Sequence, residues 1–467
     1  MDVGRIDTFT FLIPALTVFA GLIFIFITLR SPFRALLIML PFMIITRPIG
    51  LPVIGDRIII FDLLILVWWG CVFIRQVQGC QDVSFPKKLF WPILIYYFVL
   101  VSSFLSLING ISLLSGLEEI IVYAFLGIFA LAIIGVVRTE KELLQLVKLV
   151  IVVLAIAILY ALWEVLSTTF GLPILFPISS EFRLAGTFRQ TNQLASFLRT
   201  LLPIAWAMLF MANGLSPKMK AYLVLVSTLG IIILLLTSSR TNVIAALIEL
   251  LIFVGVAIIQ FFRGRANFSL QTIGLIISCA LILIIFLPRV TGTYWQTFLW
   301  RFAPIYANIG DSRIVDNVFS ATTTNPLGRE FAENNWLVGF EAFKDHPWIG
   351  TGVGNFSLLY TIVRGRQYEV HSGYLNLLAE RGIIGTLTFV IFLLLLLRMA
   401  IKNLYLNSTL FWIAFALLMA YLGSLISGVY VIFFRRREFW LVLSLIIVYY
   451  QLYSRSFYDR KDNTTSV

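Results

Sequence analysis

Runs of about 20 apolar residues recur along most of the chain, and this pattern constrains the fold more than any other feature. A helix needs roughly that many residues to cross the hydrocarbon core of a bilayer. The runs that qualify lie at 9–29, 58–75, 90–109, 119–137, 148–169, 194–213, 221–239, 241–262, 271–288, 382–401, 409–431 and 439–454. A shorter run at 35–46, ended by Arg47 and Pro48, is either another span or a re-entrant piece. The sequence therefore predicts an all-α polytopic membrane protein with about 12 to 13 transmembrane helices.

The composition excludes an ordinary soluble domain. The mean hydropathy is +0.97 and only 12% of the residues are charged, whereas soluble proteins carry about 25%. A net charge of +12 would suggest a nucleic-acid partner in a soluble protein, but in a membrane protein the placement of the charges along the chain is more informative. We therefore expect membrane lipid, and no nucleic acid, among the partners.

Basic residues recur in alternate connections between the apolar runs, and these connections are predicted to be cytoplasmic. They hold Arg30 and Arg34, Lys87 and Lys88, Arg138 and Lys141, Lys218 and Lys220, Arg263 and Arg265, Arg398 and Lys402, and the tail with Arg455, Arg460 and Lys461. The other connections, at 110–118, 170–193, residue 240 and 289–381, are then external. Residues 435–437, three arginines, depart from this rule. Either they form an external cationic patch or the last two spans are drawn wrongly.

No motif in the sequence indicates a cofactor. There is no Gly-rich phosphate loop, no pair of cysteines at metal-binding spacing and no histidine cluster. Cys71, Cys80 and Cys279 are odd in number and lie in or near spans, so no disulfide framework is implied. We expect a protein without a metal ion, nucleotide or other cofactor. The first apolar run has no small-residue cleavage site after it, which favours a retained span over a signal peptide.

The hydropathy falls for about 90 residues between Arg289 and Arg381, and loops of this length are usually functional. Within this loop Trp336, Phe340 and Phe343 follow the three- and four-residue spacing of an amphipathic helix. We predict that this helix lies on the membrane or over the site. The chain thus divides into an N-terminal transmembrane scaffold (1–170), transmembrane helices with external arginine motifs (171–288), a large external loop (289–381) and C-terminal transmembrane helices with a cytoplasmic tail (382–467).

His371, near the end of this loop, is one of two histidines in the chain. An imidazole can exchange a proton near neutral pH, so a single histidine at a membrane surface is a candidate general base. The alternative is a loop histidine that caps the following helix. His346, in Asp-His-Pro-Trp, precedes a proline and is expected in a turn.

Arginines stand in two of the predicted external connections, against the charge trend. Arg183 and Arg189, with Asn192, offer two guanidinium groups and an amide, which suit the oxygens of paired phosphates; the alternative is contact with lipid headgroups. Arg240 follows Thr237-Ser-Ser and interrupts an apolar stretch, so it marks a tight external turn. Its side chain either extends to the interface or holds an anion inside the bundle.

Four carboxylates stand in or beside the spans. Glu164 and Glu249 lie within apolar runs, and a carboxylate inside a membrane is costly enough to be a functional candidate. Both lie within about two turns of a span end, so shallow burial is the alternative. Glu118 and Glu119 precede a span and are expected to cap its N-terminus.

The order of these motifs is similar to that of the bacterial O-antigen ligase and O-antigen polymerase superfamily. His371-Ser-Gly-Tyr-Leu and the following Glu-Arg-Gly-Ile-Ile-Gly resemble the end of that family's external loop, with Ser372 in place of the usual Asn. The segment 343–356, the run Arg183-Leu-Ala-Gly-Thr-Phe through Asn192, and Ser-Arg240 resemble three further family segments. The resemblance covers roughly residues 180 to 390. Relatives usually carry an arginine one helical turn before the position matched by Trp336, where this chain has Ala332. Arg329 and Arg313 are the two candidates to supply that charge, if either does.

The resemblance implies a lipopolysaccharide ligase-like glycosyltransferase of the bacterial inner membrane, with its site facing the periplasm. It would move a glycan from a polyprenyl-diphosphate carrier, undecaprenyl diphosphate, to a lipid-anchored glycan acceptor. His371 would be the base that takes the proton of the acceptor hydroxyl, and Arg240 would bind the diphosphate in a cavity shared with His371. The remaining residues implied are Arg189, Arg183 and Arg329 for the diphosphate, and Asn192, Glu380 and Tyr374 in supporting roles.

Several functions stay open on the sequence. A ligase uses a lipid-anchored sugar core as acceptor, a polymerase extends a second carrier-linked glycan, and a protein acceptor is a third possibility. A solute transporter of the bicarbonate type is the alternative from a different class. It would show interrupted spans with polar groups near the midplane and an internal repeat, and neither is evident. A purely structural assembly partner would leave the arginine and histidine pattern unexplained.

Overall fold

The computed structural model describes residues 19–46, 58–80, 83–85, 89–173, 183–211, 216–263, 326–364, 370–407 and 409–464, and of 261, 326–335, 363–364 and 455–464 only the helical backbone. The α-helices are α2 (Pro32–Met39), α3 (Ile60–Val77), α4 (Phe90–Ser106), α5 (Leu113–Val136), α6 (Glu140–Phe170), α7 (Thr191–Phe210), α8 (Pro217–Leu236), α9 (Arg240–Phe262), α13 (Pro326–Asp345), α14 (Phe356–Arg364), α15 (Gly373–Leu406), α16 (Phe411–Ser427) and α17 (Arg437–Thr464). Short 3₁₀ helices include η1 (Leu40–Ile44) and η5 (Phe433–Arg435).

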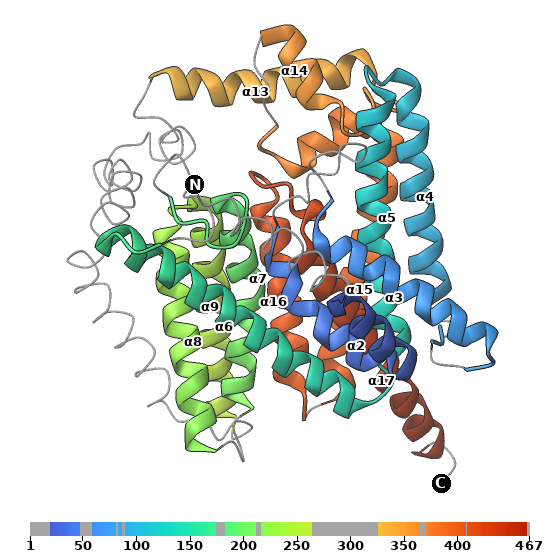
Figure 1. Ribbon diagram of the computed structural model, residues 1–467, viewed down its shortest axis with the longest axis vertical. Helices are drawn as coiled ribbons and strands as arrows, with labels where there is room; N and C mark the ends of the chain where they lie inside the picture. Colours follow the sequence, from blue (N-terminus) through green and yellow to red (C-terminus); the bar gives the residue numbers. More distant parts are fainter. Residues whose placement is uncertain are drawn as a thin grey trace, which may run out of the picture.

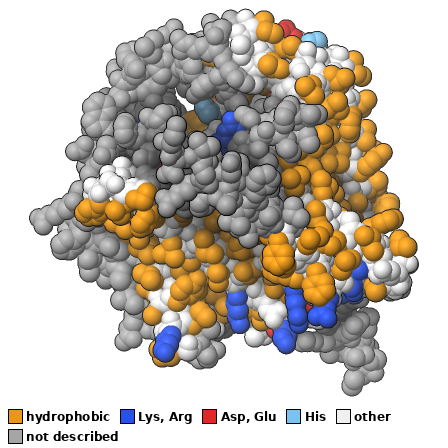
Figure 2. Space-filling view, in the orientation of Figure 1, with side chains coloured by type: hydrophobic (Ala, Val, Ile, Leu, Met, Phe, Trp, Pro, Cys, Tyr) orange, Lys and Arg blue, Asp and Glu red, His pale blue; other side chains and the backbone are white. Residues whose placement is uncertain are grey.

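Eight of the described helices are long and apolar enough to cross a membrane, and three shorter apolar helices accompany them. The predicted class, an all-α polytopic membrane protein, is therefore confirmed. The first predicted span is helical from Phe19 to Arg30, and the span predicted at 271–288 lies outside the described residues. In Figure 2 a broad belt of hydrophobic side chains covers the middle of the molecule, as expected of a surface in contact with lipid.

The short apolar run at 35–46 does not form a span of its own. It folds as α2 followed directly by η1, and Ser31 caps α2 by accepting a hydrogen bond from the Arg34 amide. Eight α-helical residues rise only about 12 Å, which is less than half of the hydrocarbon core. This segment matters for the site because the carbonyl of Ile44 and the hydroxyl of Thr46 hold an external segment described below.

The helix ends divide into two groups on opposite sides of the hydrophobic belt. Lys and Arg side chains gather along one edge of the belt in Figure 2, and α13 lies across the other end of the bundle in Figure 1. At the α13 end α7, α9 and α15 begin and α16 ends. These helices also pack together, because α16 contacts α7, α9 and α15. Polar residues that begin or end these four helices are therefore brought to one side of the molecule.

The arginines at 435–437 lie at the α13 end, but they do not form a free cationic patch. Arg435 forms an ion pair with Glu119 and lies 3.6 Å from Glu380. Arg437 forms an ion pair with Asp62. Their carboxylate partners come from α3, α5 and α15 and are buried. The spans before and after these arginines, α16 and α17, lie close to where the sequence predicts them, so the departure from the charge rule is resolved by pairing.

Glu118 and Glu119 do not cap the helix that they precede in the sequence pattern, so this prediction is wrong. The helix α5 begins two turns earlier, at Leu113, and its N-cap is Ser112, whose hydroxyl accepts a hydrogen bond from the Ser115 amide. The apolar residues at 113 and 114 extend the helix beyond the predicted start. Glu119 is 2% exposed and instead serves as the partner of Arg435.

The Gly-rich segment 350–354 packs against the ends of α4 and α5 and against the first part of α15. Gly350, Gly352 and Gly354 have positive φ angles of 78°, 96° and 73°. A Cβ atom on Gly350 would lie 2.3 Å from the Glu380 carbonyl carbon, and the Gly352 amide donates to the Glu380 carbonyl at 3.1 Å. Glycine is therefore required here by backbone conformation and by close approach.

The helix α15 breaks at Gly382, whose φ is 61° and ψ is −164°. The amides of Ile383 and Ile384 leave the helical pattern and donate to the carbonyls of Pro347 and Trp348, at 2.8 and 3.1 Å. The amides that the break releases from the helix therefore hold the turn after α13. The break falls at the sequence boundary predicted between residues 381 and 382.

Candidate active site

The segment that carries Arg183 and Arg189 is held in place by a buried carboxylate. Glu164, near the end of α6, is 3% exposed and accepts a hydrogen bond from the Gly186 amide at 2.5 Å. The positive φ of Gly186, 61°, turns the chain at this point. Thr187 donates its hydroxyl to the Ile44 carbonyl at 2.8 Å. The intramembrane Glu164 thus orders an external arginine segment.

Arg183 joins this segment to the turn before Arg240. Its Nε donates to the Thr237 carbonyl at 3.3 Å, and its Nη2 donates to the side-chain oxygen of Asn192 at 3.1 Å. The guanidinium is buried, with 9% of the residue exposed. Arg189, in contrast, is exposed, and its amide donates to the Thr46 hydroxyl at 2.8 Å. Two motifs that are about 50 residues apart in sequence therefore meet through one side chain.

The turn at 237–240 has an unusual backbone. Ser238 has a φ of 54°, a left-handed conformation that costs energy for a residue with a side chain, and among described residues other than glycine it alone has a positive φ. The Thr237 hydroxyl donates to the Leu234 carbonyl at 2.6 Å, and the Asn242 amide group donates to the Ser239 hydroxyl at 3.0 Å. These contacts fix the start of α9, so Arg240 stands half-buried at its first residue.

His371 stands just before α15 and is not the residue that caps this helix. Ser372 is the N-cap, because its hydroxyl accepts a hydrogen bond from the Leu375 amide at 3.3 Å. The Gly373 amide donates to the Gly428 carbonyl at 2.8 Å, and the Tyr374 hydroxyl donates to the Leu425 carbonyl at 2.6 Å. These bonds fasten the residues after His371 to the end of α16. Because Ser372 is the N-cap residue, His371 does not cap α15, and His371 itself is exposed.

The cap explains why serine can stand where the resembling family has asparagine, because both are strong N-cap residues. We expect Ser372→Asn to leave the thermal unfolding midpoint of the purified protein unchanged within error. Ser372→Ala should lower it, since the loss of an N-cap costs about 1 kcal/mol. If alanine is tolerated as well as asparagine, the hydroxyl of Ser372 does not stabilise α15.

Glu380, nine residues after His371 on α15, contacts the Gly-rich segment. It is 2% exposed, and its carboxylate accepts a hydrogen bond from the Phe356 amide at 3.4 Å. Asn355 is fully buried, accepts from the Ser112 amide at 2.6 Å and donates to the Val353 carbonyl at 3.0 Å. Through these contacts Glu380 and Asn355 hold the Gly-rich segment on the helix bundle.

The predicted helix is confirmed as part of α13, which packs against α15, but Trp336 and Phe340 of its predicted apolar face are exposed. Val338 and Ala342 are buried on one face, and the Trp336 ring lies 5.6 Å from the ring of Tyr430 in the loop after α16. Burial raises the pKa of Tyr430, so its phenol stays protonated at neutral pH. Tyr430 therefore does not compete with a histidine as a proton acceptor.

Two predicted arginines are placed only in part. Arg329 lies on α13, of whose first ten side chains nothing is described, and Arg313 lies outside the described residues. His346 is exposed at the end of α13, and its carbonyl accepts a hydrogen bond from the Gly350 amide at 2.9 Å, which closes the expected turn. Within the described ranges no three His, Cys, Asp or Glu side chains are placed to hold a metal ion.

Sequence reasoning missed Arg199, which lies within the apolar run of α7. It is fully buried and forms an ion pair with Glu249 of α9 at 3.1 Å. A charged residue within a membrane span was the signal that could have identified it. Figure 2 shows a histidine side chain and a basic side chain on the face of the molecule near the α13 end.

A sequence model of the family described as O-Antigen ligase matches residues 223–390, a stretch that includes α9, Arg240, α13, the Gly-rich segment and His371. No curated protein matches the chain. The matched residues hold the turn, the loop helix and the histidine whose geometry is given above. The chain is therefore a polytopic membrane protein that is similar to the O-antigen ligase family over residues 223–390.

Proposed function

We propose that the protein transfers a glycan from an undecaprenyl-diphosphate carrier to an acceptor hydroxyl at the outer face of the bacterial inner membrane. The observation that carries the proposal is the bond from Arg183 to the Thr237 carbonyl, because it brings the two arginine motifs together. The two motifs meet at the end of the bundle where α15 begins and where His371 lies. A diphosphate carrier and an acceptor would both be within reach of such a site.

The proposed reaction needs a cation for the leaving diphosphate and a base for the acceptor hydroxyl. The acceptor oxygen attacks the anomeric carbon, the bond from that carbon to the diphosphate oxygen breaks, and the leaving diphosphate gains negative charge. A preorganised guanidinium stabilises such a developing anion in a water-poor site. His371 accepts the proton of the acceptor hydroxyl, which requires the neutral imidazole. In this scheme neither a metal ion nor a nucleotide takes part.

The arginines divide into two roles. Arg183 is buried and already bonds Thr237 and Asn192, so we assign it to positioning the turn. Arg240 stands at the N-terminus of α9, where the helix dipole adds to its positive charge, and Arg189 is exposed at the same end. These two would contact the diphosphate, with Arg329 of α13 as a third candidate.

The charge distribution supports the orientation. Lys218 and Lys220 lie in the first turn of α8, and Arg138 precedes α6, at the end opposite to α13. Cytoplasmic ends of membrane proteins are rich in Lys and Arg, so the site would face the periplasm.

The acceptor decides between a ligase, a polymerase and a protein-acceptor transferase. Deletion of the gene followed by electrophoresis of the surface polysaccharide separates them. A ligase is expected to leave the anchor without any polymer, and a polymerase to leave single-unit chains. Unchanged surface and protein-linked glycans together with altered solute uptake would contradict the transferase and favour a carrier.

A further inference from the structure

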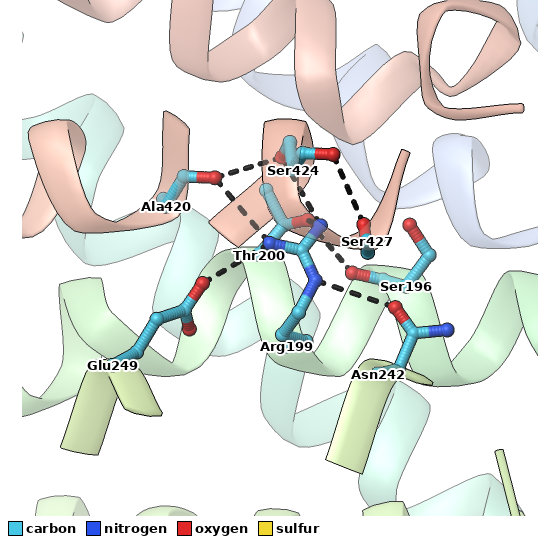
Figure 3. A network of polar contacts seen from close by, with 8 residues as sticks. All are labelled: Ser196, Arg199, Thr200, Asn242, Glu249, Ala420, Ser424 and Ser427. Atoms are coloured by element: carbon cyan, nitrogen blue, oxygen red, sulfur yellow. Dashed lines mark hydrogen bonds and ion pairs between the residues drawn. The ribbon is translucent and has the colours of Figure 1, made fainter. Parts of the chain in front are cut away.

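A buried polar network lies between α7, α9 and α16 and is centred on Arg199 (Figure 3). The guanidinium has five N–H donors, and the structure provides five acceptors for them. Nε donates to the side-chain oxygen of Asn242 (3.3 Å), Nη1 to Glu249 (3.1 Å) and to the Ala420 carbonyl (3.4 Å), and Nη2 to the hydroxyls of Thr200 (2.8 Å) and Ser424 (3.0 Å). A guanidinium that is satisfied in this way is a structural anchor and not a site for a ligand.

Arg199 contacts α9 at two positions along its length, Asn242 and Glu249. Asn242 and Glu249 are seven residues apart, two helical turns, and so lie on one face of α9. Asn242 continues the connection outward, because its amide group donates to the hydroxyl of Ser239 at 3.0 Å. Ser239 directly precedes Arg240. A continuous path of polar bonds therefore leads from Arg199 to the turn that presents Arg240.

The third helix, α16, packs closely against the ion pair of Arg199 and Glu249 at Gly423. A Cβ atom on Gly423 of α16 would lie 1.4 Å from Glu249 Oε1 and 2.8 Å from Arg199 Nη1. The carboxylate thus occupies the space that a side chain at this position would fill. Breaking a buried ion pair leaves a charge without its partner and is strongly destabilising, so this pair holds the three helices in one relative position.

The outer ends of these same helices carry the candidate site. The Arg183 segment leads into α7, Arg240 begins α9, and α16 ends at Ser427. The next residue, Gly428, accepts a hydrogen bond through its carbonyl from the Gly373 amide, beside His371. We infer that Arg199 is a positioning residue for glycan transfer: by binding Glu249 and Asn242 it sets the depth and rotation of α9 and thereby places Arg240 opposite His371. This inference rests on the proposed function for its kinetic part only.

The first test is a double-mutant cycle on turnover by the purified protein, with the lipid-linked glycan as donor. Arg199→Met/Glu249→Gln removes both charges while Gln keeps the shape that fits Gly423. We expect kcat to fall by about 10- to 100-fold with little change in KM, because misplacing a catalytic group by about 1 Å costs up to ~10²-fold. In the Arg240→Lys background the same replacement should cost less than ~3-fold, since the contact that it misplaces is already lost.

Two further variants and a control guard against a general loss of folding. Arg199→Lys keeps the charge but has too few donors for all five contacts, and Gly423→Ala displaces Glu249 without touching a charged residue. Both should show the same dependence on Arg240. The control is Asp62→Asn/Arg437→Met, which neutralises the buried pair between α3 and α17. Its effect on kcat should multiply with that of Arg240→Lys, because this pair does not touch α9.

A second test measures the position of α9 relative to α16 and does not depend on an activity assay. Nitroxide labels at Ile244→Cys on α9 and Val429→Cys after α16, in protein with its native cysteines replaced by alanine, report the distance between the two helix ends. The Arg199→Met/Glu249→Gln protein should show a shifted or broadened distance distribution, and the Asp62→Asn/Arg437→Met protein the parental one. An unchanged distribution, or a multiplicative effect in the cycle, overturns the inference. If the parent protein transfers no glycan, the proposed function fails, and the label distances still decide whether Arg199 seats α9.

Discussion

His371→Ala is expected to leave expression and membrane insertion intact while lowering turnover by about 10²- to 10⁴-fold, the usual contribution of a positioned proton acceptor. Folding should survive because His371 is exposed and the cap of α15 is Ser372. The measurement is single-turnover transfer from the lipid-linked donor by purified protein. Parent activity should also rise with pH, because only the neutral ring accepts a proton.

The second histidine provides a matched control. His346 is exposed in the turn after α13 and contributes its backbone carbonyl, not its imidazole, to the Gly350 contact. His346→Ala should therefore cost less than ~3-fold in turnover, far below the 10² expected of a base. If His346 proves indispensable in correctly folded protein and His371 does not, the assignment of the base is wrong.

Arg240→Lys is expected to lower transfer by at least ~10-fold, which corresponds to about 1.4 kcal/mol of transition-state stabilisation. An ammonium group is a point charge and cannot form the two-pronged contact of a guanidinium with phosphate oxygens. Arg240→Ala should lower transfer further, because the developing charge on the diphosphate then has no cation at this position. The fall should appear in kcat more than in KM for the donor.

Two results would contradict this role. Full activity of Arg240→Lys would mean that charge alone suffices at this position. Full activity of Arg240→Ala would mean that Arg240 only fastens the turn. Arg189→Ala is the informative comparison, because Arg189 is exposed at the same end of the bundle and makes its described contact to Thr46 through the backbone amide.

The helices themselves could be predicted from the sequence because hydropathy is a local property. The run predicted at 241–262 is α9, Arg240–Phe262, and the run at 90–109 is α4, Phe90–Ser106. The start of α15 was missed by nine residues. Residues 373–381 are polar enough to resemble a loop, and they are helical because the Gly-rich segment and the end of α16 bind them. The position of the break at Gly382 depends on the carbonyls of Pro347 and Trp348, which no local pattern reveals.

The candidate site could be predicted as a set of residues but not as an arrangement. Arg183, Arg240 and His371 are recognisable because polar residues interrupt apolar runs. The bond between Arg183 and Thr237 joins residues 54 positions apart, and the pair of Arg199 and Glu249 joins residues 50 positions apart. Such pairings depend on which helices are neighbours, and hydropathy contains no information on that. Arg199 was overlooked because one cation scarcely lowers the mean hydropathy of a 20-residue run.

The glycines of the segment 350–354 and Gly382 affect how loss-of-function data on this protein should be interpreted. Gly350 and Gly382 approach neighbouring backbone so closely that a Cβ atom would lie 2.3 and 2.5 Å from carbonyl carbons. Any side chain there dislodges the external segment from the bundle. A genetic screen that scores only the final polysaccharide would therefore rank these glycines beside His371. Protein abundance measured in the same cells would separate the two groups, since misfolded glycine variants are degraded whereas a His371 variant accumulates as inactive protein.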